Sequence, residues 1–505
     1  MKKMMKKLAS IVLAIVTVLA MSIVTWAEGT TYSITINNSA EGHTYEAYQI
    51  FTGDLSGTTL SNIVWGSGVS DEGKAALDDA AAKADTLKTG ADAKAFAKEV
   101  APYLTNAAGS ANTVTDGKYV ISGLAAGYYL VKDQDGSLTG DNDSYTEYIV
   151  KVVSNTTATP KSDVPTVVKK VKDINDSTED AFTDWQDSAD HDIGDSVPFL
   201  LEATLADNVS SYTTYKVVFH DIQSKGLTYN NDAKVSIDGT ETNGFTVTST
   251  DNPDGTTALT VSCDDVIALG AGNSSVITVE YTATLNANAV LGSAGNPNKV
   301  YLEYSNNPNK SEGGNNETGK TPEDVVIVFT YKTVISKVTK NPDYDPEVEG
   351  SEEYIPLTGA EFKLEKYNKK ADEEGEWKEI TVVKNDAGTT FTFTGLDDGN
   401  YRLTETKTPA GYNSIDPIEF TVTAEHEVLS DNPELTSLSG NATTGELTFT
   451  PNTTEGSLSA DVVNMSGSTL PSTGGMGTTI FYVVGSILVL GAAILLITKK
   501  RMSAR

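Results

Sequence analysis

Residues 401–412 read Tyr-Arg-Leu-Thr-Glu-Thr-Lys-Thr-Pro-Ala-Gly-Tyr. The first five, Tyr401–Glu405, include an aromatic and a β-branched residue and have the length of a short β-strand. Pro409 and Gly411 end the run, because proline cannot donate to a sheet ladder and glycine favours turns. A short strand followed by a turn is the pattern that recurs along this chain.

Similar short strands lie on both sides of this stretch, separated by turn residues. Within about residues 332–466 they are expected at 361–367, 390–394, 418–422 and 447–450; within about 165–331 they are expected at 197–205, 215–219, 245–248, 276–285, 300–304 and 325–331. Regular short strands of this kind are typical of Ig-like sandwiches. An apolar content of 39% is sufficient for packed cores.

The first part of the chain differs, because it also contains helical patterns. Strands are expected at 32–36, 117–121, 128–131 and 145–153. Between them, Ser70 or Asp71 could cap a helix that runs through Lys88, and a second helical run follows after Gly90. The sequence therefore predicts a mainly β protein of tandem Ig-like, Cna-type β-sandwich domains, the first with a helical insertion. We expect these domains at 28–160, 161–331 and 332–469.

Charge and cysteine content limit the possible functions. The chain has 37 basic and 69 acidic residues, a net charge of -32, so it would repel phosphate backbones and we expect no nucleic-acid partner. Cys263 is the only cysteine, so an internal disulfide cannot form.

Both chain ends carry targeting patterns. Residues 1–27 have basic lysines followed by an apolar run and Thr25-Trp26-Ala27, as in a secretory signal peptide. At the other end, residues 470–505 contain an apolar stretch from Thr478 to Thr498 and a basic tail. An uncleaved N-terminal anchor and a retained single-pass C-terminal anchor are the alternatives.

The C-terminal pattern begins with Leu470-Pro471-Ser472-Thr473-Gly474. Motif, apolar span and basic tail in this order resemble the cell-wall sorting signal (LPXTG type) that sortases read. The resemblance implies cleavage after Thr473 and transfer of its carbonyl to an amine.

The third domain resembles the Cna-B type found in sortase-assembled pilins. The resemblance rests on residues 356–362 (Pro-Leu-Thr-Gly-Ala-Glu-Phe), on residues 401–412, and on Asp461-Val462-Val463-Asn464. It implies an internal isopeptide bond between Lys337 and Asn464, promoted by Glu405. Burial disfavours charge, so the lysine could become a neutral nucleophile and the glutamate a neutral acid that donates to the amide oxygen. Lys340 is a nearby competitor for the role of nucleophile. The structural alternative is that Lys337 is a surface lysine, Glu405 caps a turn and Asn464 is a turn residue.

The second domain resembles the isopeptide-forming middle domain of the same pilins. Matching stretches are residues 165–171 (Pro-Thr-Val-Val-Lys-Lys-Val), residues 219–229 and residues 301–308 (Tyr-Leu-Glu-Tyr-Ser-Asn-Asn-Pro). They imply a bond between Lys169 and Asn306 assisted by Asp221, with Lys170 and Asn307 open as alternatives. His220 beside Asp221 is expected to be structural. In the first domain the sequence offers Asp133 as an acid but no convincing lysine–asparagine pair.

Thr159-Pro160-Lys161 lies between the first two domains and resembles, in part, the pilin motif of major pilins. The resemblance implies that Lys161 accepts Thr473 of the next subunit, giving a covalent head-to-tail shaft. The implied partners are identical subunits, pilus-specific and housekeeping sortases, minor pilins and peptidoglycan, at the surface of a Gram-positive cell.

Two other functions are compatible with parts of this sequence. A wall-anchored monomeric adhesin or minor pilin would share the sorting signal without using Lys161. An enzyme is disfavoured, because the four histidines form no His-Glu-x-x-His and no Gly-x-Ser-x-Gly motif is present. We expect no cofactor and no metal: the acidic stretches 133–143 and 173–180 do not follow a calcium-loop spacing and are expected to be solvated turns.

Overall fold

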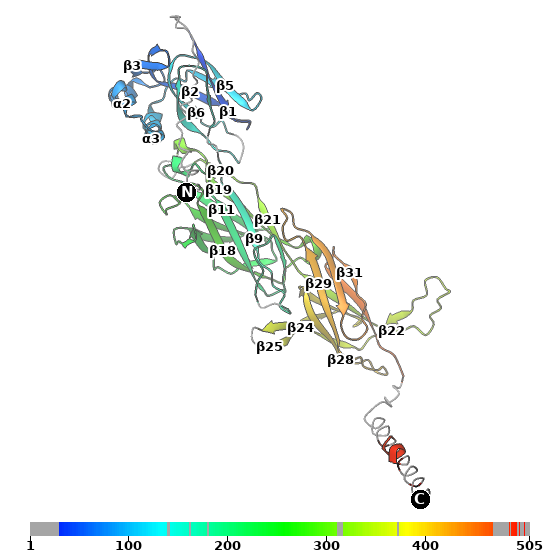
Figure 1. The fold of residues 1–505 in the computed structure, drawn as a ribbon. Helices are drawn as coiled ribbons and strands as arrows, with labels where there is room; N and C mark the ends of the chain where they lie inside the picture. Colours follow the sequence, from blue (N-terminus) through cyan, green and yellow to red (C-terminus); the bar gives the residue numbers. More distant parts are fainter. Residues whose placement is uncertain are drawn as a thin grey trace.

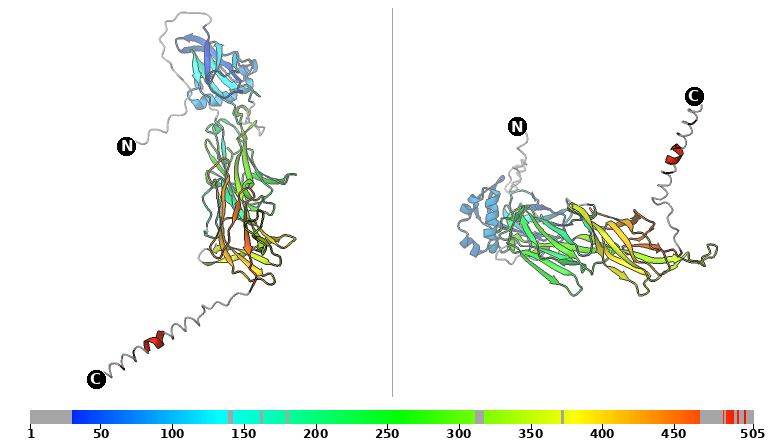
Figure 2. Two further views of the ribbon diagram at one scale, coloured as in Figure 1. Left: turned by 90° about the vertical axis from the view of Figure 1, so that its right-hand side faces the viewer. Right: turned by 90° about the horizontal axis from the view of Figure 1, so that it is seen from below.

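The computed structural model describes residues 30–138, 142–160, 163–178, 181–310, 317–370, 373–467 and short helical pieces between 484 and 499. Its strands gather into three units that follow one another along an elongated molecule (Figure 1; Figure 2). Tyr32 to Ala158 form the first unit, Thr166 to Phe329 the second and Tyr331 to Val463 the third.

The first unit contains two sheets, with strand orders β5-β1-β8 and β3-β2-β6-β7, and β4 pairs with β2. Its first and last strands, β1 and β8, are parallel neighbours. Alternation along β1 buries Ile34 and Ile36 in the core. The strands are β1 (Tyr32–Asn37), β2 (Tyr45–Ser56), β3 (Thr59–Trp65), β4 (Gly109–Ala111), β5 (Lys118–Leu124), β6 (Gly127–Asp133), β7 (Glu147–Val152) and β8 (Thr156–Ala158).

The helical insertion is present but is divided differently from the prediction. Ser70 caps α1 (Asp71–Ala76), and Asp79 caps a separate α2 (Ala80–Thr86). The single helix expected through Lys88 is wrong because Asp78 has a positive φ of 64°, which no α-helix accommodates. Gly90 starts α3 (Gly90–Val100), which continues into η1 (Ala101–Tyr103).

The second unit is a sandwich of two larger sheets. Their strand orders are β10-β21-β19-β12-β17-β16, with β20 beside β19, and β15-β14-β18-β11-β9, with β13 beside β18. The strands are β9 (Thr166–Val171), β10 (Ser188–Asp190), β11 (Ser196–Thr204), β12 (Val217–Gln223), β13 (Leu227–Tyr229), β14 (Lys234–Ile237), β15 (Thr240–Glu241), β16 (Thr246–Asp251), β17 (Thr257–Cys263), β18 (Val276–Leu285), β19 (Asn296–Ser305), β20 (Thr318–Lys320) and β21 (Asp324–Phe329). Short 3-10 turns are η2 (Val209–Ser211), η3 (Gly292–Ala294) and η4 (Pro308–Lys310).

The third unit is a second sandwich, with orders β26-β27-β22-β32-β31 and β25-β24-β28-β29-β30. Its first and last strands, β22 and β32, are parallel neighbours, with Lys337 opposite Val462. The strand expected at 447–450 is shifted, since β31 starts at Thr450. The strands are β22 (Tyr331–Lys340), β23 (Tyr354–Pro356), β24 (Glu361–Lys370), β25 (Glu373–Ile380), β26 (Val382–Lys384), β27 (Thr390–Leu396), β28 (Gly399–Lys407), β29 (Ile418–His426), β30 (Leu435–Ala442), β31 (Thr450–Asn452) and β32 (Ser457–Val463).

The fold is mainly β, as predicted, with helices confined to the first unit apart from the C-terminal pieces and short 3-10 turns in the part of the chain described. Within that part, no helix is both long and apolar enough to cross a membrane. The predicted signal peptide lies outside the described residues, as does most of the predicted span.

Candidate functional site

The third unit brings together the three residues predicted to form its cross-link. Lys337 is on β22, Glu405 is on β28 of the facing sheet, and Asn464 follows β32. Lys337 and Asn464 are fully buried, and the Glu405 side chain is equally inaccessible. The alternation along β22 explains the choice of lysine, because Lys337 points inward whereas Lys340 is exposed.

The contacts in this triad are direct. Lys337 Nζ donates to Asn464 Oδ1 at 2.5 Å, and Asn464 Nδ2 donates to Glu405 Oε1 at 2.8 Å. The same Glu405 oxygen lies 3.3 Å from Lys337 Nζ. One carboxylate oxygen therefore touches both nitrogens, whereas the sequence led us to expect Glu405 at the amide oxygen.

The surroundings of the triad hold its groups in place and disfavour charge on the lysine. Thr408 Oγ1 donates to Glu405 Oε2 at 3.0 Å, which fixes the carboxyl group. The Phe362 ring lies 5.5 Å from Lys337 Nζ. Burial lowers the pKa of Lys337, although Glu405 opposes the shift. A buried amine with a lowered pKa and an amide carbonyl in contact is suited to nucleophilic attack.

The second unit contains a comparable buried cluster around Lys169. Lys169 Nζ is hydrogen bonded to Asp221 Oδ2 and lies 3.0 Å from the Tyr281 hydroxyl. Lys169 and Asp221 are both buried. Burial lowers the pKa of Lys169 and raises that of Asp221, and their mutual attraction opposes both shifts. Lys170 points to the other face of β9 and pairs with Asp187 instead.

The asparagine beside this cluster is Asn298, not Asn306. Asn298 Nδ2 donates to the Tyr281 hydroxyl at 2.8 Å, and its buried Oδ1 has no hydrogen-bond partner in the described part of the chain. Along β12 and β19, Asp221 is opposite Val300 and Gln223 is opposite Asn298.

Asn306 lies elsewhere. It comes six residues after Val300, which corresponds to about 20 Å along an extended strand. Its backbone N–H donates to Glu317 O and its carbonyl accepts from Tyr145 N. The adjacent Asn307 donates to Glu317 Oε2 at 2.8 Å. The structure therefore does not place Asn306 beside Lys169, and the asparagine that it places at this cluster is Asn298.

A signal for Asn298 was present in the sequence. The inward positions of β19 are Asn296, Asn298, Val300, Leu302 and Tyr304, so Asn298 stands where an apolar residue would be expected. A buried amide in such a position needs a polar partner.

Two other predictions concern the first two units. His220 lies 3.0 Å from Glu303 and stacks on Tyr301, as expected of a structural histidine. Asp133 is not in a solvated turn: it is buried and lies 2.7 Å from His43 Nδ1. Asp143 lies 3.2 Å from the other ring nitrogen. The polar core of the first unit therefore contains a histidine between two carboxylates.

The residues predicted to join subunits cannot be placed. Lys161 and the sorting motif Leu470, Pro471, Ser472, Thr473 and Gly474 lie outside the described residues. Their neighbours can be placed: β8 ends at Ala158 and β9 begins at Thr166, so the segment that contains Lys161 connects the first and second units.

Three family models match separate parts of the chain. A SpaA prealbumin-like fold domain matches residues 349–433, and the Cna-B-like domain of Gram-positive pilin backbone subunit 2 matches residues 193–308. The LPXTG cell wall anchor motif matches residues 463–503.

Comparison with known proteins agrees with these matches. The chain is 25% identical over 460 residues to the trypsin-resistant surface T6 protein of Streptococcus pyogenes serotype M6, covering 77% of each. The solved T6 backbone pilin of S. pyogenes has a TM-score of 0.55 and 19% identity, with 88% of this chain and 100% of that chain covered, which shows a shared fold.

Pilin-backbone, prealbumin-like and wall-anchor regions thus occur together in one chain, and none of them is an enzyme family. The wall-anchor match places the protein at the cell surface, linked to the wall. The chain is thus similar in sequence and in fold to the cell-wall-anchored backbone pilins of Gram-positive bacteria, and these matches support a structural pilus subunit.

Proposed function

We propose that this subunit polymerises through one amide bond per junction, between Thr473 of one copy and Lys161 of the next. A sortase cysteine attacks the Thr473 carbonyl, Gly474 leaves with the rest of the tail, and the Lys161 amine then displaces the cysteine. The elongated arrangement supports this proposal (Figure 1): Lys161 belongs to the stretch of chain that links β8 of the first unit to β9 of the second, and the described chain leaves the third unit at the far end.

We further propose that the third unit cross-links itself once, without turnover. The Lys337 amine attacks Asn464 Cγ, and the bond from Cγ to Nδ2 breaks. One proton passes from Nζ to Nδ2 through Glu405 Oε1, so that ammonia leaves and the carboxyl group is regenerated. The observation that carries this proposal is the contact of one Glu405 oxygen with both nitrogens, in a site closed to water. Contact fixed by folding replaces a bimolecular encounter.

The same chemistry is proposed for Lys169 and Asn298 in the second unit, with Asp221 as the assisting acid. The two strands belong to opposite sheets, β9 in one and β19 in the other. A bond here would therefore tie the sandwich through its core, whereas the Lys337 bond would tie neighbouring strands of one sheet. Such bonds would take the place of the disulfide that a single cysteine cannot form.

The experiment for the second bond compares two asparagines. Asn298→Ala should show one ammonia loss fewer than the wild type, each relative to the mass calculated for its own sequence. Peptide mapping should then find Lys169 without a cross-link. Asn306→Ala is the matched control and should keep the bond. If Asn306→Ala loses the bond and Asn298→Ala keeps it, the assignment to Asn298 is wrong.

The experiment for polymerisation uses cells that carry Lys161→Ala. Wall extracts of the wild type should give a ladder of detergent-resistant, high-mass species, and the variant should give none. A single wall-linked species in the wild type would favour the alternative, a monomeric adhesin or minor pilin.

We propose that the resulting fibre supports adhesion and colonisation, and that minor pilins and both classes of sortase act on it.

A further inference from the structure

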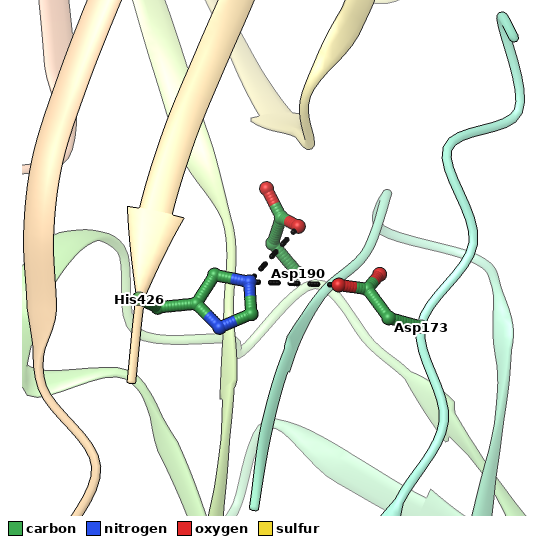
Figure 3. Close-up of side chains that lie close together, drawn as sticks. All are labelled: Asp173, Asp190 and His426. Carbon is green, nitrogen blue, oxygen red and sulfur yellow. Dashed lines mark ion pairs between the residues drawn. The ribbon is translucent and has the colours of Figure 1, made fainter. Parts of the chain in front are cut away.

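The joint between the second and third units contains a compact group of potential metal ligands (Figure 3). Asp190 ends β10 and Asp173 follows β9, both in the second unit, while His426 ends β29 of the third unit. The side chains are largely buried: His426 is 8% exposed, Asp173 14% and Asp190 4%. One donor atom from each residue lies within 4.8 Å of the others.

The donor atoms form long ion pairs, at a spacing that ligands around a metal ion also have. His426 Nε2 lies 3.5 Å from Asp173 Oδ2 and 3.6 Å from Asp190 Oδ1. An N–H···O hydrogen bond is typically about 2.7–3.2 Å long. Two ligands that each lie about 2.0–2.2 Å from a tetrahedral Zn²⁺ are separated by roughly 3.3–3.6 Å.

The hydrogen bonds of Ser188 fix the orientation of the His426 ring. Ser188 Oγ donates its only hydrogen to Glu427 O at 2.7 Å. It must therefore accept from His426 Nδ1, which lies 2.7 Å away, so Nδ1 carries a hydrogen. The other ring nitrogen, Nε2, faces the two carboxylates. A histidine that donates from one ring nitrogen to a fixed acceptor and presents the other to the ion is the arrangement found in metal sites.

An unpartnered buried hydroxyl provides a separate indication. Tyr331 is fully buried, and its hydroxyl has no hydrogen-bond partner among the described residues. Asp190 is the first of the charged groups that act on this hydroxyl. Asp398, whose N–H donates to Asp190 Oδ2 at 3.1 Å, adds another carboxyl group. The negative groups therefore outnumber the positive ones at this point.

We propose that Asp173, Asp190 and His426 bind one divalent transition-metal ion, with Zn²⁺ as the representative, and that the ion clamps the second unit to the third. Two carboxylate oxygens and one imidazole suit an ion of this class, and oxygen-only ligands would suit Ca²⁺ or Mg²⁺ better. The clamp acts across the joint, so it is independent of the cross-links within each unit.

The test uses the full chain in detergent, stripped with a chelator and titrated with Zn²⁺ in a calorimeter. We expect one tight site per chain, at least about 100-fold weaker in His426→Gln, since even the loss of an outer-shell partner weakens metal binding by 10–100-fold. His220→Gln is the matched control, because His220 is partly exposed and pairs with Glu303. Its Zn²⁺ affinity should equal that of the wild type.

A spectroscopic readout keeps the proposal testable if the variant folds poorly. X-ray absorption of the Zn²⁺-loaded wild type should show one imidazole and oxygen ligands, and Asp173→Asn should weaken binding in the same titration. Absence of a tight site in the wild type would overturn the proposal. So would equal Zn²⁺ affinity in His426→Gln, or tight Ca²⁺ binding that does not depend on His426.

Discussion

Lys337 and Lys366 are both buried lysines of the third unit, yet their surroundings differ in one respect. Lys337 has a single carboxyl neighbour, Glu405, and an amide carbonyl. Lys366 contacts three carboxylates: Asp397 of its own unit, Asp192 of the second unit at 2.8 Å and Asp176 of the second unit at 3.6 Å.

The number of carboxylates decides the charge state of each lysine. Burial lowers the pKa of both amines, and for Lys337 this effect prevails. For Lys366 the attraction of Asp397, Asp192 and Asp176 exceeds the cost of burial, so its pKa is raised. A buried lysine with one carboxyl neighbour is thus suited to react, and one with three is suited to hold two units together as an ion pair.

Removing Lys337 should have the largest effect. Its bond to Asn464 would close a loop between positions 127 residues apart, and the chain-entropy relation gives about 5 kcal/mol for a loop of that size. We expect Lys337→Ala to show one ammonia loss fewer than the wild type by intact mass. Calorimetry should show a lower melting temperature of the third unit. Lys340→Ala, at an exposed position of the same strand, should behave as the wild type. Unchanged mass loss in Lys337→Ala would exclude this lysine as the nucleophile.

Removing Lys366 should lower the stability by nearly as much, but for a different reason. Lys366→Met leaves the buried Asp397 and two partly buried carboxylates without their cation. Breaking a buried ion pair costs about 3–5 kcal/mol. Intact mass should show the same ammonia losses as in the wild type, while calorimetry should show earlier separation of the second and third units. A change in the number of ammonia losses would mean that Lys366 is itself cross-linked. The distinction between a reactive Lys337 and an ion-paired Lys366 would then fail.

His43 extends the same rule to the first unit. Burial lowers its pKa, but hydrogen bonds to Asp133 and Asp143 outweigh this and raise the pKa to about 9. A pKa raised above the unfolded value of about 6.5 gives stability that is complete below pH ~6.5 and is lost as pH rises through about 9, worth about 3 kcal/mol. The melting temperature of the first unit should fall between pH 7 and 10. His43→Gln should flatten that dependence, and an equally steep fall in the variant would contradict the assignment.

The smallest effect is expected at Lys407, within the same sequence stretch as Glu405. Lys407 Nζ lies 3.4 Å from Glu361, and both side chains are more than half exposed. Exposed ion pairs contribute about 0–1 kcal/mol. Lys407→Ala should therefore retain the cross-link and nearly the wild-type melting temperature. A large loss of stability would show that charge alone, without burial, matters at this surface.

The sequence predicted the parts of this molecule that depend on local pattern. The sequence predicted three neighbouring residues of the third unit, Lys337, Glu405 and Asn464, because each belongs to a stretch that resembles the Cna-B type of domain. In the structure, strand alternation turns Lys337 inward and leaves Lys340 exposed. Asn306 was chosen because it lies in the conspicuous stretch Tyr-Ser-Asn-Asn-Pro at residues 304–308. Asn298 was not considered, because its place beside the cluster depends on the register of β19 with β12. The break at Asp78 was missed because a positive φ leaves little trace in composition.

The groups at the joint between units could not be predicted. Lys366 meets Asp176 and Asp192, which are 190 and 174 residues away in the sequence, only after both sandwiches have formed. Likewise, Asp173 was expected in a solvated turn, but docking of the third unit covers it with His426. Such contacts depend on the relative placement of two folded units, which no local pattern encodes.

The central claim is that two buried lysines become amides as the chain folds. Intact-mass measurement of the wild-type chain tests it most directly. We predict a mass lower by two ammonia molecules than that calculated for the residues present in the purified chain, with peptide mapping that pairs Lys337 with Asn464 and Lys169 with Asn298. A mass equal to that of the unmodified sequence would contradict the account.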